Sequence, residues 1–283
     1  MERSKTTPQN LLAKKQQGNK IVRVLCYDYP MALLADRAGV DAILVGDSMA
    51  MVIMGKQTTV PVTMEEMIYH CKAVMQAVKY ALVIGDLPFL SYQTSVRDAI
   101  YNAGCLMKYG GVDAVKLEGG KEYASTVKTI VAAGIPVVGH IGLTPQMVSQ
   151  LGGYKVQGTD LLTARKLIEN DKALEEAGAF MLTLECLPDR LAELICKELT
   201  IPATGTGSGP YTDGQSLNLY DILRIFGKFV PKITKKHANL SQDILQALQK
   251  YKEEVEQGVY PGPEHSYHIK EEVLKEILLE SNG

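Results

Sequence analysis

The chain has 283 residues, 46% hydrophobic and 22% charged, so it is long enough to bury a large core and is neither disordered nor fibrous. Its 30 Lys and Arg residues against 32 Asp and Glu residues give a formal net charge of -2, with no basic surplus for binding nucleic acid. No stretch approaches the roughly 18 consecutive apolar residues of a membrane span, so we expect neither nucleic acid nor a membrane as partner.

Short apolar or β-branched runs alternate along the chain with longer stretches of helical spacing. This alternation is typical of β/α units around a parallel sheet. Residues 1–20 form an N-terminal segment before the first run. The predicted strands span residues 21–27, 40–46, 80–86, 112–118, 135–141, 179–185 and 201–207, with a weaker eighth at 227–233 that a proline interrupts.

The stretches between these strands carry helix boundary signals. Thr63 precedes a helical run and Glu66 follows three residues later, which predicts a capping box. Several units end alike, with a helix-terminating glycine that leads into a strand, as at Gly39 and Gly178. The repetition of one unit predicts a single (β/α)8 barrel over residues 21–258.

The last part of the chain departs from this alternation. Residues 240–258 form an amphipathic helical pattern, a Pro- and Gly-containing break follows, and residues 259–283 are predicted to be a C-terminal helical tail. The apolar stripe of the tail must be buried either on the chain's own barrel or against a neighbouring subunit. The stripe consists of Ile269, Val273, Leu274, Ile277 and Leu278.

Polar residues close the second to sixth predicted strands, where (β/α)8 enzymes carry their reactive groups. They are Asp47, Ser48, Asp86, Lys116, Glu118, His140 and Glu185. Four carboxylates in one barrel mouth repel each other unless a cation neutralises them. Because oxygen ligands with open positions suit Mg²⁺ better than Zn²⁺, the sequence predicts a magnesium site.

Lys116 and Glu118 are two residues apart on a predicted strand, so both side chains point to the same face. A buried lysine needs an anionic partner, which is either a carboxylate of the protein or that of an acidic substrate. His140 is either a core histidine or a member of the site. Cys186 is expected to point away from Glu185, into the helix layer, and is not predicted to be a nucleophile.

The cysteines point to a reducing environment. All five are scattered and form no C-x-x-C pair, which argues against a disulfide framework and against a structural zinc site. We therefore expect a cytoplasmic protein.

Seven blocks stand out between about residue 18 and about residue 240: YDYPMALLADRAGVDAILVGDS, TTVPVTMEEMIYH, GDLPF, GGVDAVKLEGG, PVVGHIGLTPQ, LGGYKVQG and LECLP. In this order they resemble the ketopantoate (3-methyl-2-oxobutanoate) hydroxymethyltransferase family. The resemblance implies a (β/α)8 barrel that transfers a one-carbon unit from 5,10-methylenetetrahydrofolate to 3-methyl-2-oxobutanoate, on the way to pantothenate and coenzyme A. It also implies Mg²⁺ and a large homo-oligomer, commonly a decamer.

Matched by position, the motifs imply a role for each strand-end residue. The implied metal ligands are Asp47, Asp86 and Glu118. The residues implied to bind the oxo acid are Asp47, Ser48, Asp86, Lys116 and His140. Glu185 is the implied proton acceptor of an aldol-type carbon–carbon bond formation.

One segment departs from the family's pattern. The seventh strand and its loop usually read IPVIGIGAG, whereas residues 201–209 here read IPATGTGSG. The aliphatic run that usually follows the DGQ motif reads Ser216, Leu217 and Asn218. Hydroxyl and amide groups thus replace aliphatic side chains, while the carboxylates are retained. The glycines of 205–209 are consistent with a tight turn or, less specifically, a phosphate loop.

Two other functions compete with this interpretation. A Mg²⁺-dependent α-keto acid lyase or mutase of the phosphoenolpyruvate mutase and isocitrate lyase type shares the architecture, but its catalytic cysteine loop is not found here. The chain could also be a non-catalytic paralogue, although a site without activity has no reason to keep four mutually repelling acids.

Overall fold

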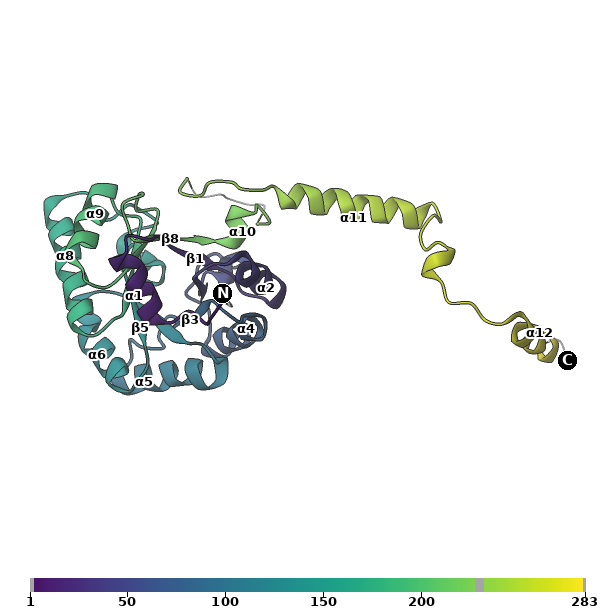
Figure 1. Ribbon diagram of the computed structural model, residues 1–283, viewed down its shortest axis with the longest axis horizontal. Helices are drawn as coiled ribbons and strands as arrows, with labels where there is room; N and C mark the ends of the chain where they lie inside the picture. The colour runs from purple at the N-terminus through teal and green to yellow at the C-terminus, as the bar shows by residue number, and fades with distance from the viewer. Residues whose placement is uncertain (1–2, 227–231, 282–283) are drawn as a thin grey trace. The chain divides into compact units, whose positions relative to one another are not determined.

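Eight parallel strands close into a barrel (Figure 1). The structure, a computed structural model, describes residues 3–226 and 232–281. Each strand pairs with the next one along the chain and the last pairs with the first, which confirms the predicted (β/α)8 barrel. The strands are β1 (Ile21–Leu25), β2 (Ala42–Val45), β3 (Leu82–Asp86), β4 (Ala114–Glu118), β5 (Val137–Gly142), β6 (Met181–Glu185), β7 (Ala203–Thr206) and β8 (Gly214–Asn218).

Helices surround the strands and cover their outward side chains. The longer ones are α2 (Tyr29–Ala38), α4 (Met64–Ala77), α5 (Val96–Cys105), α6 (Ala124–Ala132), α8 (Leu161–Glu176) and α9 (Asp189–Glu198). Short elements are α3 (Met49–Val52), the π-helical turn Leu106–Gly110, the 3-10 turns Lys121–Tyr123 and Pro145–Met147, α7 (Val148–Leu151) and α10 (Leu219–Ile222). The capping box predicted from Thr63 and Glu66 begins α4 and is confirmed.

The eighth strand is not where the sequence pattern placed it. It was expected at residues 227–233, but β8 begins at Gly214, 13 residues before the expected start. The sequence GQSLN of β8 has few β-branched or aromatic residues, so neither its composition nor its hydrophobicity marks it as a strand. Of the expected range, residues 227–231 lie outside the described residues.

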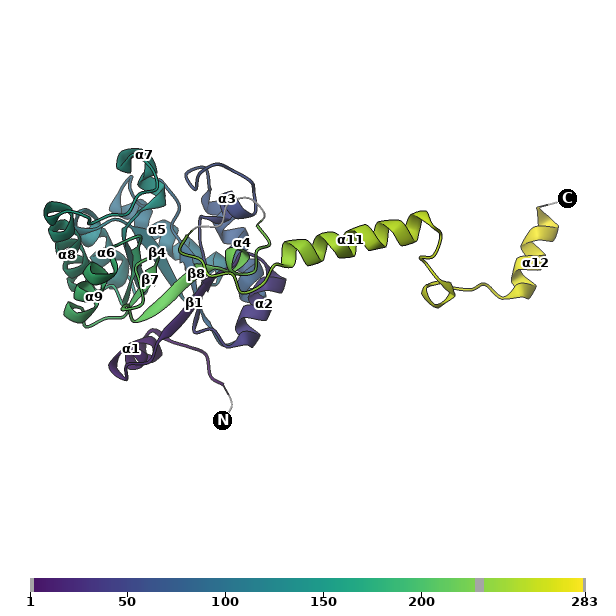
Figure 2. The same ribbon diagram turned by 90° about the horizontal axis from the view of Figure 1, so that it is seen from above.

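Helix α1 (Pro8–Gln16) covers the amino-terminal end of the barrel, at the opposite end from α3 and α7 (Figure 2). Its Leu11 is fully buried in an apolar cluster with interior residues such as Ile21, Leu82 and Met181. Burial of one leucine side chain contributes about 1.5–3 kcal/mol to stability. The barrel interior is therefore closed and apolar at this end, and open to a ligand only at the carboxyl ends of the strands.

The chain divides into two units, Met1–His237 and Ala238–Gly283. The second unit contains α11 (Leu240–Glu256), the 3-10 turn Pro263–His265 and α12 (Glu271–Glu280), in agreement with the two predicted helical runs. Apolar residues of both helices, such as Leu248 and Ile277, are exposed. The assignment of residues 21–258 to the barrel and of residues 259–283 to a separate tail stays a prediction.

Candidate active site

A cavity of about 640 Å³ lies at the carboxyl ends of the barrel strands. It collects side chains from strands on all sides of the barrel, which the parallel arrangement brings to one rim. All the strand-end residues singled out in the sequence line it: Asp47, Ser48, Asp86, Lys116, Glu118, His140 and Glu185. The structure therefore brings the predicted set together in one place.

Asp47 and Asp86 lie side by side in this cavity. Asp86 ends β3, and its Oδ2 accepts a hydrogen bond of 3.1 Å from the backbone N–H of Asp47, which follows β2. Burial, reinforced by the charges of Asp86 and Glu118, raises the pKa of Asp47 to about 8. Burial also raises the pKa of Asp86, against the opposing effect of Lys116. Two ionised carboxylates at this position would thus carry more negative charge than their surroundings compensate, which favours a bound cation.

Lys116 lies among these carboxylates on β4. Its Nζ is 2.8 Å from Asp86 Oδ1 and 3.9 Å from Glu118 Oε1. Burial lowers the pKa of Lys116, but Asp86 and Glu118 outweigh that effect and raise it overall, so the ammonium group stays charged. The anionic partner that a buried lysine requires is therefore Asp86.

His140 on β5 bridges two carboxylates from neighbouring strands. Its Nδ1 is 3.4 Å from Glu118 Oε1, and its Nε2 is 3.2 Å from Glu185 Oε2. Burial and Lys116 lower the pKa of His140, but its contacts with Glu118 and Glu185 outweigh them and raise it to about 9. His140 thus lines the cavity and contacts two of its carboxylates, which favours the second of the two alternatives left open by the sequence.

Glu185 ends β6 and differs from the other acids in its exposure. Its side chain is 20% exposed, whereas that of Glu118 is 1% exposed. A carboxylate that is held by a histidine on one side and reaches the cavity on the other can exchange a proton with a bound molecule.

Ser48 is held by a chain of hydroxyl and amide groups on the other side of the cavity. Its Oγ is 2.8 Å from the hydroxyl of Tyr27, which also accepts a hydrogen bond of 2.8 Å from the amide of Asn218. Tyr27 follows β1 and Asn218 ends β8, so these contacts cross the seam where the barrel closes. They fix the orientation of the Ser48 hydroxyl beside Asp47.

Gln146, which the sequence did not single out, ties the acids to each other. Its side-chain amide donates to Asp47 Oδ2 at 2.8 Å and to the carbonyl of Leu87 at 2.9 Å, while its backbone N–H donates to Glu118 Oε2 at 3.0 Å. Its amide oxygen accepts from the hydroxyl of Tyr92 at 2.9 Å. Gln146 and Tyr92 both lie in loops or turns that follow strands, and no spacing rule of the sequence connects these two residues to the carboxylates.

Arg23, on β1, also lines the cavity and was not predicted. The signal was present in the sequence, because Arg23 occupies an inward position between Ile21 and Leu25, two residues from each, in a run that is otherwise apolar. A charged residue inside a barrel strand is itself a pointer to a site.

Cys186 differs from its expected placement. Its backbone has a φ of 51°, in the left-handed region, and the residue lines the cavity rather than pointing into the helix layer. The strand β6 ends at Glu185, so the alternation of side chains does not continue to Cys186. The turn of the backbone at Cys186 brings this residue to the cavity. Burial, with the charge of Glu185, raises the pKa of the thiol to about 11, so Cys186 is a neutral thiol at neutral pH.

The donors in the cavity fit a hard divalent cation in part. Among the described residues, no three His, Cys, Asp or Glu side chains form a group that could hold a metal ion. The predicted third ligand, Glu118, is engaged by His140 and Gln146. Asp47 and Asp86 are two buried, adjacent carboxylates whose pKa values are raised by burial, although Gln146 and Lys116 also contact them. Mg²⁺ commonly uses only one or two carboxylates beside substrate and water.

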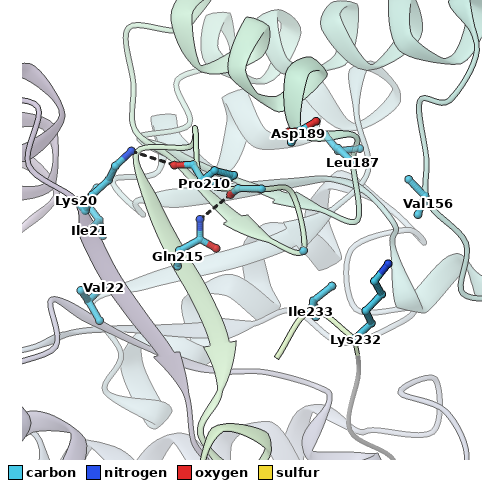
Figure 3. Close-up of a pocket in the computed structure, with 12 residues that line it drawn as sticks. Lys20, Ile21, Val22, Val156, Leu187, Asp189, Pro210, Gln215, Lys232 and Ile233 are labelled. Atoms are coloured by element: carbon cyan, nitrogen blue, oxygen red, sulfur yellow. Dashed lines mark hydrogen bonds between the residues drawn. The ribbon is translucent and has the colours of Figure 1, made fainter. Parts of the chain in front are cut away.

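A second cavity of about 820 Å³ lies outside the barrel mouth, beside β1 and β8 (Figure 3). Lys20 and Gln215 are each hydrogen-bonded there to the carbonyl of a neighbouring loop residue, Pro210 and Gly209 respectively. One carboxylate, that of Asp189, lines this cavity among its described residues. The clustered acid and base groups are those of the barrel mouth, which is therefore the candidate active site.

Comparison with known proteins assigns the chain to a family. Residues 5–263 match the family described as ketopantoate hydroxymethyltransferase. The chain belongs to the ketopantoate hydroxymethyltransferase family. A 3-methyl-2-oxobutanoate hydroxymethyltransferase from Moorella thermoacetica is 55% identical over 266 residues, which cover 94% of this chain and 99% of the relative. A 3-methyl-2-oxobutanoate hydroxymethyltransferase from Carboxydothermus hydrogenoformans is 50% identical over 273 residues, which cover 96% of this chain and 99% of the relative.

Solved structures share the fold of this hydroxymethyltransferase family member at low sequence identity. A phosphonopyruvate hydrolase in complex with oxalate and Mg²⁺ has a TM-score of 0.60 at 13% identity, covering 98% of this chain and 97% of that one. A 2,3-dimethylmalate lyase of the PEP mutase/isocitrate lyase superfamily has a TM-score of 0.58 at 16% identity. The match covers 98% of this chain and 96% of that one. In the part of the chain that the structure describes, no helix is long and apolar enough to cross a membrane.

Proposed function

We propose that the chain transfers a hydroxymethyl group from 5,10-methylenetetrahydrofolate to 3-methyl-2-oxobutanoate and forms 2-dehydropantoate, in the synthesis of pantothenate and coenzyme A. The observation that carries the proposal is the arrangement of Asp47, Asp86 and Lys116 beside the His140–Glu185 pair. It combines groups for holding an α-keto acid with a group for removing its proton. Relatives at 50% and 55% identity carry the corresponding name.

Mg²⁺ would be held by Asp47 and Asp86. Bound there, it would supply Lewis acidity toward the oxygens of the α-keto acid. Glu118, the third carboxylate implied by the resemblance, would add negative charge to the site, and its oxygens contact His140 and the N–H of Gln146. Gln146 orients Asp47 through its side-chain amide.

The remaining substrate contacts come from Ser48, Lys116 and His140. The ammonium group of Lys116 offsets the negative charge of the substrate, in a buried position where water does not screen it. The hydroxyl of Ser48 is oriented by Tyr27 and is available to a substrate oxygen. These groups would hold the oxo acid with its C3 atom near Glu185, the acid that is partly exposed in the cavity.

Glu185 would take the proton from C3 of the oxo acid. The electron pair of the broken C3–H bond remains on the substrate, which becomes an enolate. The C3 atom of this enolate then forms a bond to the methylene carbon of the folate. Both bonds from that carbon to the two folate nitrogens break, one as the bond to C3 forms and one as water supplies the hydroxyl group. The two nitrogens take up the proton held by Glu185 and the second proton of the water, and tetrahydrofolate leaves. His140 holds the Glu185 carboxylate in place during the proton transfer.

The test is product formation by the purified chain with both substrates and Mg²⁺, followed by mass spectrometry. Accumulation of 2-dehydropantoate supports the proposal. Cleavage of 2,3-dimethylmalate or 2-methylisocitrate without formation of 2-dehydropantoate would instead assign the chain to the lyase type. Mg²⁺-dependent binding of 3-methyl-2-oxobutanoate without turnover would make it a non-catalytic binding protein.

The family resemblance also supports a cytoplasmic homo-oligomer, such as a decamer. All five cysteines are free in the structure. Sedimentation velocity at micromolar concentration tests the assembly, because a decamer and a monomer of 31.0 kDa sediment at clearly different rates.

A further inference from the structure

The barrel interior beneath the candidate active site is apolar on one side and polar on the other. On the side of β2, β3 and β5 the inward residues include Leu44, Ile84 and Val138, which belong to one buried apolar cluster. The charged residue on this side, Lys116 on β4, is paired with Asp86. On the side of β6, β8 and β1 the corresponding residues are Thr183, Ser216 and Arg23, all buried. Barrel interiors are normally filled with branched apolar side chains, so the polar side requires an explanation.

Arg23 is the centre of this polar side. Its Nε donates a hydrogen bond of 2.8 Å to Ser216 Oγ, and its Nη2 donates one of 2.8 Å to Thr183 Oγ1. The residue is 1% exposed, and its Nη1 has no hydrogen-bond partner among the described residues. Thr204, which is paired with Thr183 in the strand register, likewise has a buried hydroxyl without such a partner within the described chain.

The positive charge of Arg23 also has no ion-pair partner among the described residues. Among the described residues, no carboxylate forms an ion pair with it, although Asp86 and Glu185 are near enough to influence it. Burial lowers the pKa of Arg23 to about 10, which still leaves the guanidinium protonated at neutral pH. A buried charge with a free donor is costly unless a ligand pairs with it.

Arg23 lies at the border of the active-site cavity. Arg23, Thr183 and Ser216 line that cavity together with Asp86 and Glu185. Hydrogen bonds to two hydroxyls fix the plane of the guanidinium, so it is oriented before a ligand arrives. A planar, fixed guanidinium with an unpaired nitrogen favours a carboxylate as its partner.

We propose that Arg23, with Thr183 and Ser216, forms a carboxylate-binding site on the floor of the active-site cavity. The chain thereby accepts 2-oxo acids whose side chain ends in a carboxylate, in addition to the branched apolar acid. This inference rests on the proposed function, because it assumes that the Glu185 side of the cavity enolises a 2-oxo acid. Two hydroxyl-bearing departures from the family's pattern, at 204 and 216, lie on this same polar side of the barrel.

The test measures exchange of the C3 protons for deuterium in D2O with Mg²⁺ and without the folate. In this exchange the C3–H bond breaks, the proton passes to Glu185, and a deuteron from the solvent returns to C3. Three acids are compared by NMR: 3-methyl-2-oxobutanoate, 2-oxoglutarate, and 5-methyl-2-oxohexanoate, in which an isopropyl group replaces the terminal carboxylate of 2-oxoglutarate.

We expect the unaltered chain to exchange 2-oxoglutarate at least about 10-fold more efficiently than 5-methyl-2-oxohexanoate, as kcat/KM. Arg23→Met should reduce this ratio by about 10-fold or more, because it removes the charge but keeps a similar volume. A general effect of Arg23 on Asp86 or Glu185 cancels in this ratio, because exchange of 2-oxoglutarate and exchange of 5-methyl-2-oxohexanoate depend equally on these two carboxylates. Arg165→Met, on the exposed surface of α8, is the matched control and should leave the ratio unchanged.

Absence of a preference for 2-oxoglutarate in the unaltered chain overturns the inference, and so does a ratio that Arg23→Met leaves unchanged. If Arg23→Met does not fold, Ser216→Ala replaces it, since it removes the hydrogen bond that orients Nε and should also lower the ratio. Exchange of 3-methyl-2-oxobutanoate with no preference for the carboxylate contradicts the inference alone. Exchange of none of the three acids contradicts the proposed function, and the inference with it.

Discussion

The imidazole of His140 places its Nε2 3.2 Å from the Oε2 of Glu185, and its other nitrogen 3.4 Å from Glu118. The histidine thus fixes the one acid of the group that is partly open to the cavity. It does so from a fully buried position on the neighbouring strand β5. This pairing distinguishes Glu185 from Asp47 and Asp86, which face each other and lack a histidine contact among the described residues.

The first prediction concerns Glu185 as the proton acceptor. Glu185→Gln keeps the shape of the side chain but cannot take a proton from C3, so kcat should fall by about 10²-fold or more. Mg²⁺ affinity should change little, because Glu185 is not one of the two proposed ligands. Steady-state turnover and calorimetric Mg²⁺ titration check the two parts. Glu176→Gln, exposed on α8, is the control, and an unaltered turnover number in Glu185→Gln would contradict the role.

Gln146 is predicted to act as a positioning residue for Asp47. Gln146→Leu removes the hydrogen bond to Asp47 Oδ2 at nearly constant volume, and we expect Mg²⁺ affinity to fall by about 10- to 100-fold, as for other partners of metal ligands. At saturating Mg²⁺, kcat should largely recover, which a general loss of structure would not allow. Gln150→Leu, exposed on α7, serves as the control. Equal Mg²⁺ affinity in Gln146→Leu and the unaltered chain would show that Asp47 needs no such support.

Asp171 on α8 is predicted to make stability depend on pH. The residue is 1% exposed, and burial, reinforced by Glu198, raises the pKa of its carboxyl from 3.8 to about 7. The folded chain therefore holds this proton over a pH range in which the unfolded chain has lost it. Its contribution is present below about pH 4 and is lost as the pH rises toward 7.

Asp171→Asn should accordingly raise the free energy of unfolding at pH 8 by about 1–2 kcal/mol, and by much less at pH 4. Urea denaturation at the two pH values measures the difference. Asp243→Asn, on the exposed surface of α11, should show no such pH dependence. A variant that is less stable than the unaltered chain at pH 8 would contradict this account of Asp171.

Leu11 is predicted to be the main stabilising contact of α1. Leu11→Ala should lower the free energy of unfolding by about 2–5 kcal/mol, because it leaves a cavity in the apolar cluster at the closed end of the barrel. Its neighbour Leu12 is only partly buried, so Leu12→Ala should cost clearly less. Thermal and urea denaturation compare the two variants. Similar losses for both would mean that α1 does not close the barrel through Leu11.

The strand-end acids could be predicted because the barrel geometry determines their position. In a closed parallel barrel every strand ends at the same rim, so a polar residue at a predicted strand end must face that rim. The spacing of Lys116 and Glu118 likewise determined that both point inward. The seven predicted strands from β1 to β7 carried enough apolar or β-branched residues to be found.

Other parts of the site could not be predicted because their contacts depend on tertiary structure. Gln146 reaches Asp47 from a turn 99 residues further along the chain, and no local pattern records that distance. The strand β8 was missed because its inward residues are polar, which is also the property that links Ser216 to Arg23. Arg23 itself was visible as a charge inside an apolar run, but its partner Thr183 lies 160 residues away.

Calorimetric titration of Mg²⁺ into the unaltered chain and into Asp47→Asn and Asp86→Asn tests most directly whether these two carboxylates hold the ion. We expect about one Mg²⁺ per unaltered chain, as for a site of two carboxylates completed by water and substrate. The Mg²⁺ affinity of each variant should be lower by about 10²-fold or more, because each substitution removes one of the two proposed carboxylate ligands. Binding of equal strength in the unaltered chain and both variants, or no binding to the unaltered chain at millimolar Mg²⁺, would contradict the account.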